Sequence, residues 1–175
     1  MPAFDTPNGF RMTTTNSSLS TRPLTIISGG QTGVDRAALD MAMALKLPHT
    51  GWCPRGRLAE DGPIDPVYNL QETSTSTYSQ RTHRNVTDSD GTMIIYLSVL
   101  SGGSLLTSQS AKKAGRPLLL VDLESANDKN FQTVLSWLDD ERIHFLNVAG
   151  PRESTHPGIY NRASIFLRRL LSPSA

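Results

Sequence analysis

The stretch TIISGGQTGVDRAALDMAMALKL, residues 25–47, joins an apolar run to a helical pattern through a pair of glycines. Its first residues are apolar and β-branched, which is typical of a buried strand. Beyond the glycines, small and apolar residues recur at helical spacing, at Ala37, Ala38, Met41, Ala44 and Leu45. The stretch therefore predicts a strand, a turn and a helix in succession.

The rest of the chain repeats this alternation. Residues 55–73 are rich in glycine and proline, which excludes a long regular element there. Runs typical of strands lie at 24–28, 49–54, 91–100, 118–123 and 143–151, and runs typical of helices at 34–45, 76–90, 101–115, 128–139 and 157–171. Such alternation predicts one Rossmann-like α/β domain, with a parallel sheet and helices on both of its faces.

Composition and charge narrow the classes of function. The chain has 175 residues, with 17 basic and 16 acidic side chains and a formal charge of +1. This balance provides no overall field to attract nucleic acid or a membrane surface, so we predict neither as a partner and expect any anion site to be local. The single cysteine cannot form an internal disulfide, and no apolar run approaches the ~18 residues of a membrane span. We expect a soluble cytoplasmic protein.

The N-terminal residues differ in composition from the rest. Residues 1–22 are rich in Ser, Thr and Asn and lack the apolar core of a secretory signal. We interpret them as a flexible tail before a single domain over residues 23–175. A transit peptide is the alternative, favoured by Arg11 and Arg22 but opposed by Asp5 and by the lack of a clear amphipathic helix.

The glycine bend at residues 29–33 raises the possibility of an anion site. A helix start leaves N–H groups without partners and carries the positive end of the helix dipole, and glycines let a ligand approach the backbone. The sequence GGQTG matches neither the Walker pattern nor the spaced dinucleotide fingerprint. The bend is therefore either a phosphate cradle, supported by the cation of Arg36, or simply a tight turn. Asp35 beside it either caps or pairs locally or contacts a ligand.

A second glycine bend favours the phosphate cradle. The stretch SGGSLLT, residues 101–107, follows a later strand. Open parallel sheets bind ligands in the crevice outside the carboxyl ends of their strands, so two glycine-lined helix starts there can hold two parts of one anionic molecule. Arg152, in the AGPRES stretch after the last strand, is a further candidate at the same edge.

Five stretches together carry a resemblance to a known family. They are SGGQTGVDRAALD, GWCPRGRLAEDGPI, TYSQRTHRNVTDSDGTMII, SGGSLLT and LNVAGPRES, the last followed by PGIY. In this order, from about Leu24 to the end of the chain, they resemble the molybdenum carrier family, that of the molybdenum cofactor carrier proteins. That family is similar to the wider lysine-decarboxylase-like Rossmann superfamily, which includes cytokinin phosphoribohydrolases.

The resemblance implies a function in cofactor storage and transport. A carrier of this kind binds molybdenum cofactor (molybdopterin), a pterin with a terminal phosphate and a dithiolene-held molybdenum. It protects this cargo from oxidation and delivers it to apo-molybdoenzymes such as nitrate reductase. The resemblance also implies a homo-oligomer, a dimer or a tetramer.

The resemblance also assigns residues to the site. It places the cofactor phosphate at Gly29, Gly30, Gln31, Thr32 and Gly33, supported by Arg36. The opposing helix start would donate hydrogen bonds from Ser101, Gly102, Gly103 and Ser104. The segment between the two bends would line the crevice, with anion contacts from Arg55 and Arg57. In that segment Trp52 either stacks on the pterin or packs in the core, and Glu60 and Asp61 either bond pterin nitrogens or cap a turn.

The motifs also bear on catalysis. Phosphoribohydrolases of the superfamily use a PGGxGTxxE motif whose glutamate assists cleavage of an N-glycosidic bond, whereas SGGSLLTSQS here has no second Gly-Thr and no glutamate. We therefore predict a binding protein with no catalytic residues. Cys53 is interpreted as a small buried hydrophobe and the four histidines lack ligand spacing, so no metal site is predicted. The alternatives are a nucleotide-binding sensor and a phosphoribohydrolase-like enzyme of the same superfamily.

Overall fold

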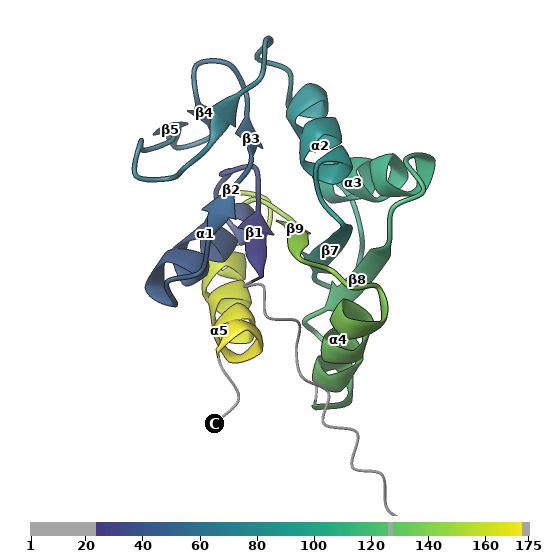
Figure 1. Ribbon diagram of the computed structural model, residues 1–175. Helices are drawn as coiled ribbons and strands as arrows, with labels where there is room; N and C mark the ends of the chain where they lie inside the picture. Colours follow the sequence, from purple (N-terminus) through teal and green to yellow (C-terminus); the bar gives the residue numbers. More distant parts are fainter. Residues whose placement is uncertain (1–23, 126–127, 173–175) are drawn as a thin grey trace, which may run out of the picture.

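The computed structural model describes residues 24–125 and 128–172 (Figure 1). A five-stranded sheet in the order β2-β1-β9-β7-β8 forms its centre, and all of its strand pairs are parallel. Its strands are β1 (Thr25–Ile27), β2 (His49–Thr50), β7 (Gly91–Tyr96), β8 (Leu118–Asp122) and β9 (Phe145–Ala149). The predicted tail, residues 1–22, lies outside the described residues.

Helices cover both faces of this sheet. They are α1 (Val34–Ala44), α2 (Tyr78–Thr87), α3 (Gly102–Lys113), α4 (Asp128–Asp140) and α5 (Ile159–Leu171). From β1 to β2 and from β8 to β9 the chain moves along the sheet in one direction, and from β7 to β8 in the other. Because such crossovers are right-handed, α1 and α4 lie on one face and α3 on the other. The predicted Rossmann-like fold is confirmed.

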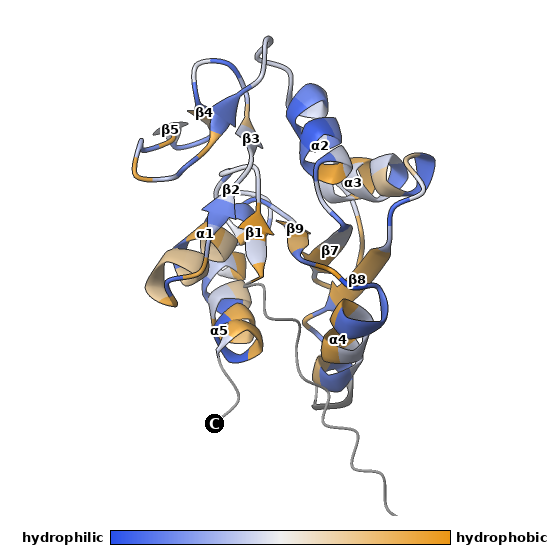
Figure 2. Ribbon diagram, in the orientation of Figure 1, coloured by the Kyte–Doolittle hydropathy of each residue, from blue (hydrophilic) through white to orange (hydrophobic). Residues whose placement is uncertain are grey.

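The hydrophobic core reflects this division. Residues of α1, α4 and α5 share one buried cluster with the sheet, which includes Val34, Val134 and Ile159. The rings of Phe131 and Phe166 join α4 to α5 edge to face, with their centroids 6.2 Å apart. On the other face α2 packs against α3, as Figure 1 also shows. Figure 2 shows that α2 is mostly hydrophilic, as its sequence predicts, while β1, β8 and β9 of the central sheet are largely apolar.

One predicted strand is divided in two. The run 49–54 was expected to be continuous, but β2 ends at Thr50, and β3 (Trp52–Cys53) pairs with β6 (Gln71–Glu72) in a small separate sheet. Gly51 separates them, with a φ of 149°, and a Cβ there would overlap the carbonyl oxygen of Ser28. The break therefore follows from a close approach of two backbones.

The segment after β3 contains only short elements, as its glycines and prolines predict. Its strands β4 (Leu58–Ala59) and β5 (Gly62–Pro63) form an antiparallel pair. The segment is attached to α1 by a second buried cluster of Leu39, Cys53, Ile64 and Leu70. Burial raises the pKa of the Cys53 thiol. Within the described ranges no helix has the length and apolarity to cross a membrane.

Two tyrosines hold this segment and α5 to α1. The hydroxyl of Tyr68 donates to Asp40 Oδ1 at 2.7 Å, and that of Tyr160 donates to Asp40 Oδ2 at 2.6 Å. Burial and the adjacent Asp40 carboxylate raise the pKa of both tyrosines. Asp40 therefore joins three parts of the fold.

Tyr160→Phe is expected to lower the free energy of unfolding by about 1 kcal/mol at pH 7, because Asp40 loses one of its donors. Without the substitution, both tyrosines release their phenolic protons near pH 10 in the unfolded chain but retain them in the folded chain. The free energy of unfolding therefore falls as the pH rises above about 10. The variant should show a smaller fall. Urea denaturation at pH 7 and pH 10.5 measures both effects. Tyr96→Phe is the control, and an equal change in it would contradict the assignment.

Candidate functional site

A cleft of about 250 Å³ opens at the carboxyl ends of the central strands. Its walls come from the loops after β1, β9 and β7 and from the adjoining faces of α2 and α3. The chain leaves β1 in one direction along the sheet and β7 in the other, and ligands of open α/β sheets bind at such a switch point. Residues of four segments line it, among them Gln31, Arg81, Gly102, Gly103, Arg152 and His156.

The start of α3 faces this cleft without a cap. The N-terminal flanking residue, Ser101, makes no side-chain capping bond. In the described part of the chain, the N–H groups of Gly102, Gly103 and Ser104 have no hydrogen-bond acceptor. A Cβ added at Gly102 or Gly103 would meet no atom within 4 Å. This helix start is therefore an open site for an anion.

Arg81, on α2, supplies a cation to the wall of the same cleft. Its Nη1 donates to Asp35 Oδ2 at 2.8 Å, and the two side chains are only 14% and 4% exposed. Burial raises the pKa of the Asp35 carboxyl, although Arg81 opposes the shift. A Cβ at Gly29 would overlap Arg81 Nη1 and approach Asp35 Oδ2 to 2.8 Å. Gly29 thus provides the space in which α1 and α2 hold this guanidinium.

Arg152 and Tyr78 form the rim of the cleft. The guanidinium carbons of Arg152 and Arg81 lie 5.6 and 5.9 Å from the centroid of the Tyr78 ring. Arg152 also lies 3.7 Å from Glu60 Oε2, and its side chain is 40% exposed. The cleft therefore combines two cations, an aromatic ring and a helix N-terminus.

The first glycine bend, by contrast, is largely engaged within the chain. Gln31 Oε1 accepts from the N–H of Thr32 at 3.0 Å and from that of Glu60 at 2.9 Å. The N–H of Val34, at the start of α1, donates to the carbonyl of Pro151 at 3.2 Å. These contacts occupy donors that a phosphate at this bend would need.

Glu60 binds the loops around this bend to one another. It accepts hydrogen bonds from the Thr32 hydroxyl and from both the N–H and the hydroxyl of Ser154. Burial acts to raise the pKa of the Glu60 carboxyl, but the hydrogen bonds from Ser154 and Thr32 outweigh it and lower the pKa. Glu60 therefore holds the loop after β1 to the loop after β9.

The structure brings four of the predicted site residues into the cleft wall: Gln31, Ser101, Gly102 and Gly103. Ser104 follows them in the first turn of α3, and its buried hydroxyl has no hydrogen-bond partner among the described residues. Gly30 and Gly33 face other parts of the chain, since a Cβ at Gly30 would press on Leu70 and one at Gly33 would overlap the carbonyl of Pro151. The Thr32 hydroxyl is directed to Glu60.

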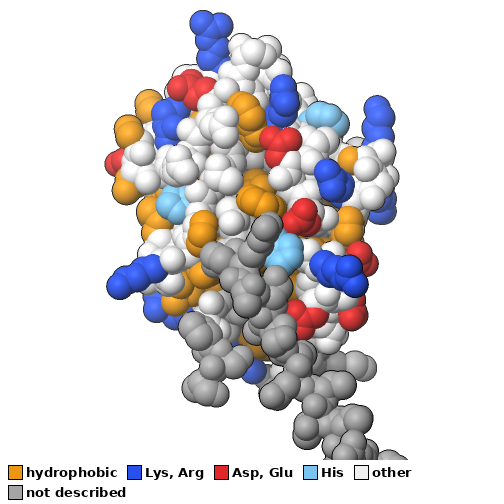
Figure 3. All heavy atoms as spheres, viewed as in Figure 1, with side chains coloured by type: hydrophobic (Ala, Val, Ile, Leu, Met, Phe, Trp, Pro, Cys, Tyr) orange, Lys and Arg blue, Asp and Glu red, His pale blue; other side chains and the backbone are white. Residues whose placement is uncertain are grey.

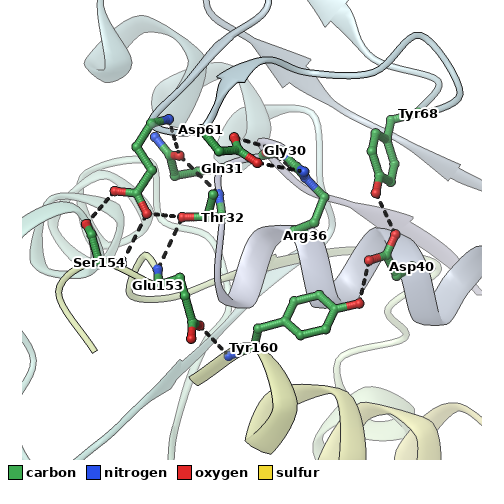
Figure 4. Close-up of polar contacts among 11 residues, drawn as sticks. Gly30, Gln31, Thr32, Arg36, Asp40, Asp61, Tyr68, Glu153, Ser154 and Tyr160 are labelled. Atoms are coloured by element: carbon green, nitrogen blue, oxygen red, sulfur yellow. Dashed lines mark hydrogen bonds and ion pairs between the residues drawn. The ribbon is translucent and has the colours of Figure 1, made fainter. Parts of the chain in front are cut away.

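The three predicted arginine contacts lie outside the cleft. Arg36 donates to the carbonyl of Gly30 and pairs with Asp61 at 3.3 Å, as Figure 4 shows. Arg57 donates to backbone carbonyls at Ile64, Asp65, Tyr68 and Leu70. Arg55 borders a separate shallow hollow beside Glu72. Arg57 is engaged because the segment after β3 has little regular structure and needs donors for its carbonyls, whereas Arg36 is engaged by the Gly30 carbonyl and by Asp61.

Trp52 also lies away from the cleft. Its indole N–H donates to Asp88 at 2.7 Å, and Arg84 stacks on its ring. Asn85 fixes the Trp52 backbone to α2 through hydrogen bonds to its N–H and its carbonyl. The tryptophan therefore joins β3 to α2.

Sequence reasoning missed Arg81 and Tyr78. They are three residues apart on α2 and therefore share one face of the helix. The sequence of this helix is polar almost throughout, so its spacing does not mark Arg81 as the residue that points inward. The visible face in Figure 3 mixes basic and acidic side chains and shows no broad patch of one charge.

The chain is similar to a known protein family and to a solved structure. Residues 26–171 match the profile of the family described as "Circularly permutated YpsA SLOG family". A crystal structure named "Putative molybdenum carrier protein", from Syntrophus aciditrophicus SB, is 45% identical to the chain, with a TM-score of 0.81 over 87% of this chain and 98% of that one. No curated protein matches the chain. The predicted resemblance to the molybdenum carrier proteins is confirmed, and the chain belongs to the circularly permutated YpsA SLOG family.

Proposed function

We propose that this protein binds molybdenum cofactor, protects it from oxidation and delivers it to apo-molybdoenzymes such as nitrate reductase. The observation that carries the proposal is the uncapped start of α3, which opens into a cleft that also contains Arg81 and Arg152. The terminal phosphate of the cofactor matches this combination of N–H donors and cations. The name of the similar crystal structure, a molybdenum carrier protein, agrees with such a cargo.

We assign the parts of the cargo to different walls of the cleft. The phosphate binds to the N–H groups of Gly102 and Gly103, with Arg81 opposite. The pterin lies toward the Tyr78 ring. A volume of about 250 Å³ is small beside the ~300–1,000 Å³ usual for ligand pockets. The molybdenum end therefore extends to the mouth, where a second copy in the predicted dimer or tetramer would cover it.

The acidic groups of the cleft support a carrier rather than a hydrolase. Among the described residues that line it, Asp35 is the only one with a carboxylate. That carboxylate is held by Arg81 at 2.8 Å, so its negative charge already has a partner. No carboxylate follows at the start of α3, where the related phosphoribohydrolases have their glutamate. The proposed activity is therefore binding and transfer over residues 23–175, with no catalytic step.

The proposal is tested by an anaerobic protection assay. Purified protein is loaded with molybdenum cofactor, and transferable cofactor is followed over time by activation of cofactor-free nitrate reductase, with and without excess AMP. The expected result is a loss of cofactor much slower than in buffer and unaffected by AMP. Loss at the rate of buffer, with AMP bound instead, would support nucleotide binding and overturn the carrier proposal.

Gly103→Asp tests the α3 anion site. The new carboxylate would project into open space, so the fold should persist, and its charge would repel phosphate at the helix start. We expect affinity for the cofactor to fall more than about tenfold, by analogy with the loss of a charged hydrogen bond. The protection assay measures this, with thermal unfolding as the check on folding. Gln109→Asp, on an exposed part of the same helix, is the control.

A further inference from the structure

We infer that Gln31 selects the cargo, by donating a hydrogen bond from its side-chain amide to an oxygen acceptor of the bound molecule. The inference rests on the proposed function in that it needs an oxygen-bearing ligand in the cleft. The acceptor is a phosphoryl oxygen or a ring carbonyl oxygen, two groups that the experiment below distinguishes.

The orientation of this amide is determined by its neighbours. Its oxygen accepts two backbone hydrogen bonds, from Thr32 at 3.0 Å and from Glu60 at 2.9 Å. Only the carbonyl oxygen of an amide can accept, so a flipped side chain would place NH₂ against two N–H groups. The nitrogen therefore points away from both backbone donors.

That nitrogen has no partner in the described chain. The Gln31 side chain is 95% buried, as its 5% exposed fraction indicates, and its Nε2 atom donates no hydrogen bond. Buried amide donors are nearly always satisfied, because an unmet donor away from water destabilises the fold. The residue also lines the cleft. A ligand in the cleft is thus the group that can supply the missing acceptor.

Other unsatisfied groups lie beside the same cleft. Arg81 Nε and the Ser104 hydroxyl are also buried without partners in the described residues. Arg81 lines the cleft with Gln31, and Ser104 belongs to the open first turn of α3. All three groups can donate hydrogen bonds. Together they favour an anionic ligand that carries several oxygen acceptors.

Gln31→Glu replaces only the side-chain nitrogen, which is the proposed donor, with an oxygen. One carboxylate oxygen would still accept from Thr32 and Glu60, while the other would replace the donor with a charged acceptor. We expect the variant to fold and its affinity to fall more than about tenfold at pH 8. Affinity should recover as the pH is lowered and the carboxyl becomes a protonated donor, which a purely structural role would not produce. Gln109→Glu, on the exposed part of α3, is the matched control.

Calorimetric titration with inorganic phosphate, AMP and GMP identifies the acceptor. If the Gln31→Glu variant loses affinity for all three probes, the Gln31 amide donates to the phosphate. If it loses affinity for GMP alone, the amide donates to a ring carbonyl, which AMP lacks. In the native protein, the side-chain amide signal of Gln31 in a ¹H–¹⁵N spectrum should shift on binding while that of Gln109 does not. This measurement holds even if the variant fails to fold.

The outcomes separate this inference from the carrier proposal. The inference alone is overturned if the native protein and the Gln31→Glu variant protect molybdenum cofactor equally well and the Gln31 amide signal does not shift. Native protein that binds GMP or AMP through Gln31 but gives molybdenum cofactor no protection overturns the carrier proposal alone. An amide signal of Gln31 that shifts neither with molybdenum cofactor nor with any of the three probes overturns the inference whatever the protection assay gives.

Discussion

Arg81→Gln is expected to lower the free energy of unfolding by about 3 to 5 kcal/mol and to abolish binding of the cargo. The substitution leaves the Asp35 carboxylate, whose side chain is 4% exposed, without the cation that lies 2.8 Å away. It also removes a positive charge from the cleft into which the start of α3 opens. Urea denaturation measures the first effect and the anaerobic protection assay measures the second.

A second substitution separates the two roles of Arg81. In Arg81→Gln/Asp35→Asn the unpaired charge is absent, so most of the lost stability should return while binding stays weak. Arg84→Gln, one turn along α2, removes only the stacking of its side chain on Trp52 and should lower stability by about 1 kcal/mol or less. If the double variant were as unstable as the single one, the buried ion pair would not be the cause.

Gly33→Ala is expected to destabilise the protein by about 3 kcal/mol or more. Gly33 has a φ of 78° and a ψ of −128°, a conformation that L-amino acids rarely adopt. A Cβ there would also overlap the carbonyl oxygen of Pro151 and lie 2.9 Å from backbone atoms of Arg152 and Glu153. These are backbone atoms of the loop after β9, so they cannot move aside cheaply. Thermal and urea unfolding measure the loss.

Gly103→Ala is the matched control for that substitution. Gly103 lies in the first turn of α3, and its added Cβ would meet nothing within 4 Å. Because alanine favours the helix over glycine, we expect unchanged stability or a gain of up to about 1 kcal/mol. Similar losses in the two variants would mean that the contact between Gly33 and the β9 loop is not what constrains this bend.

Most of the fold was predictable from local pattern. The strand at Thr25–Ile27, the helix at Val34–Ala44 and the later alternation appear where apolar spacing predicts them. The division of 49–54 into two strands was not predictable, because it depends on Gly51 lying against Ser28, 23 positions earlier in the chain. Periodicity reports which face of an element is buried, and it carries no information on which distant backbone lies there.

The sequence by itself determined the α/β class, the two glycine bends at strand ends and the family resemblance, because these depend on residue spacing along the chain. Only the tertiary structure decided which bend is open. The first bend is closed by hydrogen bonds that involve Gln31, Glu60 and Pro151. The N–H groups at the start of α3 have no such partners among the described residues. It likewise placed Arg81 beside Asp35 and left Arg57 among carbonyls. A charged side chain binds whichever partner folding brings within about 3 Å, and burial then determines how strongly the pair is held.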